Sequence, residues 1–337
     1  MIKAYITVLL GLLMLCCACR KKDPLAGIDK SALFAPPTKE ELDAVQAAWQ
    51  ARDLSPRNIT TEATHVIDNK LRLVIISFRA SGSKQYAGVL VPTTQKTLPV
   101  RLYIAGFSLN DAVSRQSIQI SSSATDTLPF VYVVPALKGQ SLSLSVNGVE
   151  YKTPVSEGQR NDAFDGATDD AIACLNAVGK TFKEADTSKV MTQGGSRGGT
   201  VALLMAERDQ RVKLAAAVAF PADLLALTAA NQHDPTYKFQ FLDALINGSA
   251  TLEETRKKLL AASPLYFCNH LPEIQAHFGD QDNITPPAQG ELLRNAMKDA
   301  GKEADIGLFI YKGRGHENIG NNNLEMQQRI ENFFRQI

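Results

Sequence analysis

The sequence has little net charge and few cysteines. Its 36 basic and 35 acidic residues give a formal net charge of +1 at pH 7. No basic patch interrupts this balance, which argues against nucleic acid or a strongly acidic partner. Three of the 5 cysteines lie within Cys16–Cys19, so only Cys174 and Cys268 remain further along the chain. An oxidising compartment would permit a bridge between these two, but buried free thiols are common and we expect that state here.

Long apolar runs are also missing, apart from one at the N-terminus. A short basic start, Met1–Lys3, precedes the apolar stretch Ala4–Leu15. That stretch is shorter than the roughly 20 residues that a membrane-spanning helix needs. The pattern therefore predicts an export signal rather than a retained helix.

The residues after this stretch resemble the end of a bacterial lipoprotein signal, in which a cysteine just past the apolar region is cut free and acylated. Cys19 fits best, because the small Ala18 precedes it and a run of charges follows it. Cys16 and Cys17 stay as alternative acylation sites. The resemblance implies a signal peptide over residues 1–19 and a protein anchored by lipid in the bacterial cell envelope, facing the periplasm or the surface. A plain secretory signal and an uncleaved anchor are the other interpretations.

The rest of the chain is long enough for one large core. With 337 residues, of which 45% are hydrophobic, it fits one domain over residues 61–337 behind an N-terminal tether and helix, residues 20–60. Asp23–Pro37 is typical of a loop. Thr38–Asp43 has the pattern of a capping box that opens a helix to about residue 52.

From about residue 61, apolar runs of strand length alternate with segments of helical periodicity. This alternation predicts an α/β fold with a mostly parallel sheet covered by helices on both faces. A longer interruption, about residues 221–269, is expected to form a cap over the active site. The sequence favours strands at 70–78, 87–91, 100–105, 130–134, 189–193, 213–220, 274–278 and 306–311, and helices near 166–179, 198–208, 287–300 and 323–336.

The most informative segment is Val190–Thr200, which holds Ser196 between paired glycines where a strand meets a helix. A sharp turn of this kind exposes a serine hydroxyl for attack and crowds its neighbours. Gly194 and Gly198 must then lack side chains. The segment indicates a nucleophile elbow; a glycine-rich turn with an uninvolved serine is the alternative.

A serine nucleophile needs a base and an acid. Of the 5 histidines, His316 alone lies in a glycine-rich loop directly after an expected strand, where the ring could reach the serine. Asp280 and Asp282 lie between the serine and this histidine, again just past a strand, and the loop pattern favours Asp282. His277 with both aspartates suggests a metal site instead. No fourth ligand is evident and a strand places His277 in the sheet layer, so we expect no metal.

These motifs, in this order, resemble those of the α/β-hydrolase superfamily and, within it, the catalytic domain of the prolyl oligopeptidase family, over residues 65–337. The resemblance implies that Ser196 is the nucleophile, His316 the general base and then acid, and Asp282 the carboxylate that orients the imidazole. It also implies an oxyanion hole made by the backbone N–H of Arg197 and one from Gly106 or Phe107. No cofactor is required.

Peptidases of that family carry a large N-terminal propeller, whereas about 40 residues precede the expected hydrolase strands here. We therefore expect a small-molecule carboxylic ester as substrate. A serine peptidase without a propeller and a non-catalytic binding lipoprotein of the envelope are the alternatives.

Several other side chains allow two interpretations each. Arg197 and Arg314 either grip a substrate carboxylate or brace loops. The acidic run Asp162–Asp170 is calcium-like in composition but lacks the spacing of a binding loop, and acidic residues are expected near a helix start. Cap residues that line an acyl site or form the cap core are His233, Tyr237, Phe239 and Phe241.

Overall fold

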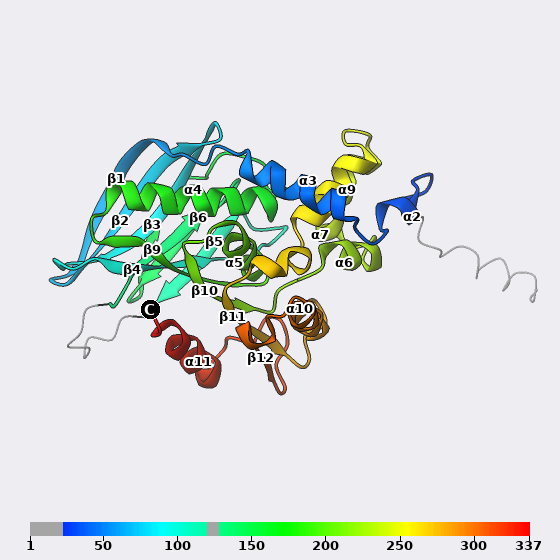
Figure 1. Ribbon diagram of the computed structural model, residues 1–337. Coiled ribbons are helices and arrows are strands. Elements are labelled where there is room, and N and C mark those ends of the chain that lie inside the picture. The colour runs from blue at the N-terminus through cyan, green and yellow to red at the C-terminus, as the bar shows by residue number, and fades with distance from the viewer. Residues whose placement is uncertain (1–22, 120–127) are drawn as a thin grey trace, which may run out of the picture.

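The computed structural model describes residues 23–119 and 128–337, so the expected lipidation site Cys19 lies outside the described residues. A nine-stranded sheet with the order β1-β2-β3-β6-β4-β9-β10-β11-β12 forms its centre (Figure 1). The six strands from β6 to β12 in this order pair parallel with one another, while β1, β2 and β3 pair antiparallel with each other and β3 pairs antiparallel with β6. The strands are β1 (Arg57–Asp68), β2 (Leu71–Ala80), β3 (Ser83–Pro92), β4 (Leu98–Ile104), β6 (Val131–Ala136), β9 (Ala185–Gly195), β10 (Val212–Val218), β11 (Glu273–Gly279) and β12 (Ile306–Tyr311).

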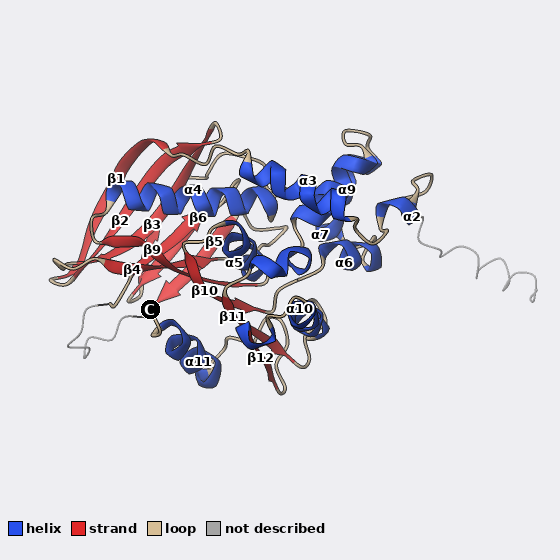
Figure 2. Ribbon diagram, viewed as in Figure 1, coloured by secondary structure: helices blue, strands red, loops and turns tan. Residues whose placement is uncertain are grey.

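One face of the sheet is covered by helices α4 (Asp165–Thr181), α5 (Arg197–Arg208) and α10 (Ala288–Asp299), which share a core with the sheet residues on that face. Most of the strands beneath them are buried on both faces, which explains their nearly continuous apolar sequences. The predicted mostly parallel α/β sheet is therefore confirmed, as Figure 2 shows.

The other face differs from the expectation of helices. Helix α11 (Leu324–Phe334) covers its β9–β10 part, but a three-stranded sheet of β5 (Val113–Ile118), β7 (Ser141–Val146) and β8 (Val149–Lys152) covers the β2–β3 part. Leu142 and Leu144 point from β7 into that core. The segment Ser141–Val146 alternates serine with apolar residues, the pattern of a half-buried strand, which the sequence-based interpretation missed.

The N-terminal segment is more ordered than a loop and tether. Leu25 and Leu33 are fully buried, and a short helix α2 (Lys30–Leu33) precedes α3 (Lys39–Gln50). The predicted capping box at Thr38 is present. Strand β1 begins at Arg57, before the expected domain start. The sequence did not predict this strand, because it is a mostly exposed edge strand and lacks the apolar alternation by which strands are recognised.

Between β10 and β11, residues 221–269 form the segment expected to be the cap. Their helices are α6 (Leu224–Ala230), α7 (Pro235–Tyr237), α8 (Asp243–Ile246) and α9 (Leu252–Ala261), with a π-helix at Lys238–Leu242 and a 3-10 helix at Pro264–His270. Cys174 and Cys268 are both buried and free, as predicted. No helix in the described part of the chain is long and apolar enough to cross a membrane.

Candidate active site

Ser196 lies in a strained turn between β9 and α5. Its backbone has φ 53° and ψ −129°, a conformation that side chains rarely adopt and that is stored where function needs it. A β-carbon on Gly198 would lie 2.0 Å from the Ile104 carbonyl oxygen, and one on Gly194 would lie 2.3 Å from Gly198 backbone atoms. The two glycines are thus required by the close approach of β4, β9 and α5.

Ser196, His316 and Asp282 form one hydrogen-bonded chain. His316 Nε2 lies 2.9 Å from Ser196 Oγ, and His316 Nδ1 lies 2.8 Å from Asp282 Oδ2. The three residues follow β9, β12 and β11, whose carboxyl ends meet at one edge of the parallel sheet. The structure therefore brings together the side chains that the loops after these strands suggested.

The Asp282 carboxylate is buried and held by its own turn. Its Oδ1 accepts hydrogen bonds from the backbone N–H of Ile284 at 2.9 Å and of Thr285 at 2.8 Å. Asp280 does not reach the histidine; its carboxylate caps the neighbouring loop by accepting from Gly313 N–H at 2.7 Å. The geometry thus separates the two competing aspartates.

Thr285 is a site residue that the sequence-based interpretation missed. Its buried hydroxyl donates to the Ala219 carbonyl at 2.8 Å, and it lies 3.0 Å from both Asp282 Oδ2 and His316 Nδ1. The available signal was its position three residues after the aspartate, where a backbone N–H commonly binds an aspartate side chain.

His277 belongs to the core and not to a metal site. Its Nδ1 lies 2.9 Å from the Tyr311 hydroxyl, and its ring stacks on Phe309. Burial lowers the pKa of His277 to about 3, so the ring is neutral at physiological pH. Among the described residues, no cluster of histidine, cysteine and carboxylate side chains could hold a metal ion.

The residues expected to supply the oxyanion donors, Gly106, Phe107 and Arg197, line the cavities at Ser196. Gly106 passes so close that a β-carbon there would lie 3.7 Å from Ser196 Cβ. Phe107 follows Gly106 in the loop after β4, and Arg197 is the first residue of α5, where backbone N–H groups have no partner within the helix. Helix N-termini of this kind favour negative charge.

Both arginines near the site brace loops. Arg314 donates to the Asn318 carbonyl at 3.2 Å and to the Asn321 carbonyl at 2.8 Å. The Arg197 side chain is buried and donates to four uncharged oxygen atoms, among them the carbonyls of Ala105 and Gly106. Gripping a substrate carboxylate is therefore not the role that these contacts support.

Two cavities meet at Ser196 and His316. The first has a volume of about 370 Å³ and is lined partly by polar side chains, including Asp111, Gln140 and Glu317. The second has a volume of about 610 Å³ and lies against the cap, where Tyr237 and Phe241 line it. These two cap aromatics also pack in the core that the cap shares with Leu25, Leu33 and Trp49, so they line the cavity and form part of the cap core.

The remaining cap side chains lie elsewhere. Phe239 stacks on Phe107 with ring centroids 6.3 Å apart, and His233 is not among the residues that line either cavity at Ser196. The cap thus contacts the loop after β4 as well as the second cavity.

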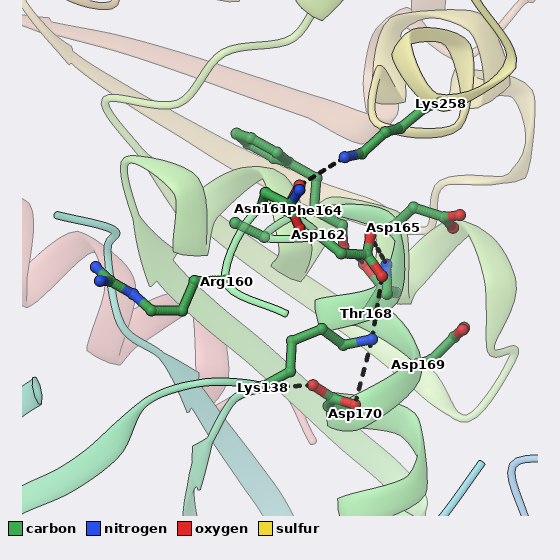
Figure 3. A network of polar contacts seen from close by, with 12 residues as sticks. Lys138, Arg160, Asn161, Asp162, Phe164, Asp165, Thr168, Asp169, Asp170 and Lys258 are labelled. Carbon is green, nitrogen blue, oxygen red and sulfur yellow. Dashed lines mark hydrogen bonds and ion pairs between the residues drawn. The ribbon is translucent and has the colours of Figure 1, made fainter. Parts of the chain in front are cut away.

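The acidic run at the start of α4 is neutralised by basic side chains. Lys138 Nζ donates to Asp162 Oδ2 at 3.1 Å, and Lys138 N–H donates to Asp170 Oδ2 at 2.8 Å (Figure 3). Arg52, two residues beyond the end of α3, donates to Asp165 Oδ2 at 2.7 Å and to Asp169 Oδ2 at 2.8 Å. Burial raises the pKa of Asp170 to about 7. The network holds the chain before α4 in place, and the calcium-like composition has this structural explanation.

Comparison with known proteins agrees with this geometry. The family model described as "Prolyl oligopeptidase family" matches residues 157–337, more than half of the chain. No curated protein sequence matches.

Solved structures match over most of the chain. Acetyl xylan esterase 1 from Thermoanaerobacterium sp. JW/SL YS485 is 15% identical with a TM-score of 0.58, covering 88% of this chain and 92% of its own. The acetyl xylan esterase from Paenibacillus sp. R4 is 15% identical with a TM-score of 0.58, covering 90% of this chain and 99% of its own. A putative dipeptidyl aminopeptidase IV from Bacteroides ovatus ATCC 8483 is 15% identical with a TM-score of 0.56, covering 84% of this chain and 36% of its own. These matches confirm the predicted α/β-hydrolase fold.

Proposed function

The chain belongs to the prolyl oligopeptidase family and is a serine hydrolase, and we propose that it hydrolyses carboxylic esters through an acyl-enzyme on Ser196. The observation that carries the proposal is the hydrogen-bonded chain from Ser196 Oγ through the His316 ring to Asp282. A serine beside a base that is itself oriented by a carboxylate is the arrangement that activates a hydroxyl for acyl transfer.

The reaction begins when Ser196 Oγ bonds to the carbonyl carbon and its proton passes to His316 Nε2, 2.9 Å away. The carbonyl π electrons move to the carbonyl oxygen, which the N–H groups of Arg197 and Phe107 stabilise. His316 then protonates the leaving oxygen as the ester bond breaks and the alcohol departs. Water repeats these steps on the acyl-enzyme and releases the acid, with Asp282 holding the ring throughout.

Two features support an ester rather than a peptide as substrate. The acetyl xylan esterases match over 92% and 99% of their own lengths, whereas the aminopeptidase matches over 36% of its length. The polar lining of the first cavity, with Asp111, Gln140 and Glu317, suits an alcohol that carries further hydroxyl groups. A family peptidase acting on short peptides is the second candidate, supported by the family itself.

A substrate panel separates these candidates. We expect kcat/KM for 4-nitrophenyl acetate and butyrate to exceed that for aminoacyl 4-nitroanilides by at least about 100-fold, or about 2.7 kcal/mol in activation free energy. An acetylated xylose should also release acetate, and Ser196→Ala should abolish every activity. Strong anilide turnover with negligible ester turnover would replace the esterase with a peptidase.

We also propose that the protein is exported and anchored in the bacterial cell envelope by acylation of Cys19. The support is the sequence alone, because residues 1–22 lie outside the described part of the chain. Labelled palmitate should be incorporated into the wild type and not into Cys19→Ser, with Cys16→Ser and Cys17→Ser as matched controls. Labelling of Cys19→Ser equal to that of the wild type would refute this site. Loss of label in Cys16→Ser or Cys17→Ser would instead assign the acylation to that cysteine.

A further inference from the structure

The loop after β4, residues 105–111, is held by two arginines from distant parts of the chain. Arg160 Nη2 donates to the carbonyls of Ser108 at 2.5 Å, Leu109 at 3.2 Å and Asp111 at 3.2 Å. Figure 3 shows the Arg160 side chain extending away from the carboxylates of Asp162 and Asp170. Arg197 binds the start of the same loop, so the loop has two separate anchors.

The Arg197 contacts fall on the two peptides beside the nucleophile. Its Nε donates to the Ala105 carbonyl at 3.1 Å, and its Nη2 donates to the Gly106 carbonyl at 2.8 Å. No described peptide bond is cis, and in a trans peptide the N–H points opposite to the C=O. Because the guanidinium fixes the carbonyl of Gly106, it also fixes the N–H of Phe107, directed away from Arg197.

The guanidinium is also a buried charge, and its hydrogen-bond partners in the described part of the chain are all uncharged. Its two other acceptors are the Ala163 carbonyl at 3.3 Å and Gln140 Oε1 at 2.8 Å, both uncharged. The residue is 3% exposed. Burial lowers the pKa of Arg197 to about 9, with Asp170 opposing the shift through space, so the side chain stays cationic at neutral pH. A charge in such surroundings acts more strongly than one in water.

We propose that the Arg197 side chain is the positioning residue of the oxyanion hole. It aims the Phe107 N–H by holding the preceding carbonyls, and it places a positive charge behind that peptide. The Arg197 backbone N–H supplies the other donor, so one residue organises both. The inference rests on the proposed ester hydrolysis at Ser196. The Arg197 side chain should stabilise the transition state and not the bound substrate, because the substrate carbonyl oxygen is neutral and becomes negative only when Ser196 attacks.

Kinetics of Arg197 variants test this role. Arg197→Met should lower kcat for 4-nitrophenyl acetate by about 100-fold or more, the usual cost of losing one oxyanion donor, while KM changes less than about 3-fold. Arg197→Lys keeps the charge but loses the planar fork, so it should recover part of the lost kcat. Arg160→Met is the matched control, since it removes the other anchor of the same loop.

A thionoester gives a readout that a structural role would not move. The sulfur of 4-nitrophenyl thionoacetate accepts hydrogen bonds poorly, so an intact oxyanion hole favours the oxygen ester. The oxygen-to-sulfur ratio of kcat/KM should fall by about 10-fold or more in Arg197→Met, and stay at the wild-type value in Arg160→Met. Unfolding midpoints identify folded variants, and Arg197→Lys carries the test if Arg197→Met does not fold.

The outcomes separate the two proposals. An unchanged ratio in Arg197→Met, or an equal fall in Arg160→Met, overturns the positioning role while leaving the serine hydrolase in place. A wild type that hydrolyses neither ester overturns the proposed function itself.

Discussion

Alanine in place of Ser196 will lower kcat for ester hydrolysis by about 10⁶-fold, because the acyl-enzyme can no longer form. His316→Ala will cost about as much, since the serine then keeps its proton. The two residues act as one unit through their 2.9 Å contact, so the double variant will be no slower than either single variant. Steady-state kinetics with 4-nitrophenyl acetate measure all three.

A second histidine provides the control. His270 is exposed and lies against Gln46, away from the residues that line either cavity at Ser196. His270→Gln should keep wild-type kcat. If the fold-losses in kcat of the two single variants multiplied in the Ser196 and His316 double variant, the two residues would not act as one unit.

The second large effect concerns the two aspartates. Asp282→Asn will lower kcat by about 10⁴-fold, because an amide that donates to His316 Nδ1 favours the tautomer that cannot accept the serine proton. Asp280→Asn changes a carboxylate two residues away that accepts a hydrogen bond from Gly313 N–H, and should change kcat by less than about 3-fold, as expected for a group outside the reacting chain. Equal losses in the two variants would refute the assignment of the acid.

The parallel part of the fold could be predicted because most of its strands are buried on both faces over much of their length and carry nearly continuous apolar runs. β1 escaped notice because its side chains are mostly exposed. β5, β7 and β8 escaped because their sequences are polar on one side and short. Leu25 and Leu33 are buried only by tertiary contacts, such as those with the cap, which no local pattern reveals.

The catalytic side chains of the candidate site were more predictable than the residues that hold them and their loops in place. Ser196, His316 and Asp282 each follow a strand in a turn whose glycines or spacing are visible locally. The Arg197 side chain could not be assigned, because its direction depends on the loop after β4, some 90 residues earlier in the chain. The direction of the Thr285 hydroxyl depends likewise on its hydrogen bond to the carbonyl of Ala219, which directly follows β10. Partners distant in sequence leave no periodic signal.

Labelling with a fluorophosphonate probe tests the central claim most directly, because the probe bonds only to an activated serine in a formed oxyanion hole. The account predicts that the wild type takes up one label, carried by Ser196 in the tryptic peptide Val190–Arg197, and that Ser196→Ala takes up none. An unlabelled wild type, or a Ser196→Ala variant labelled to the same extent, would contradict it.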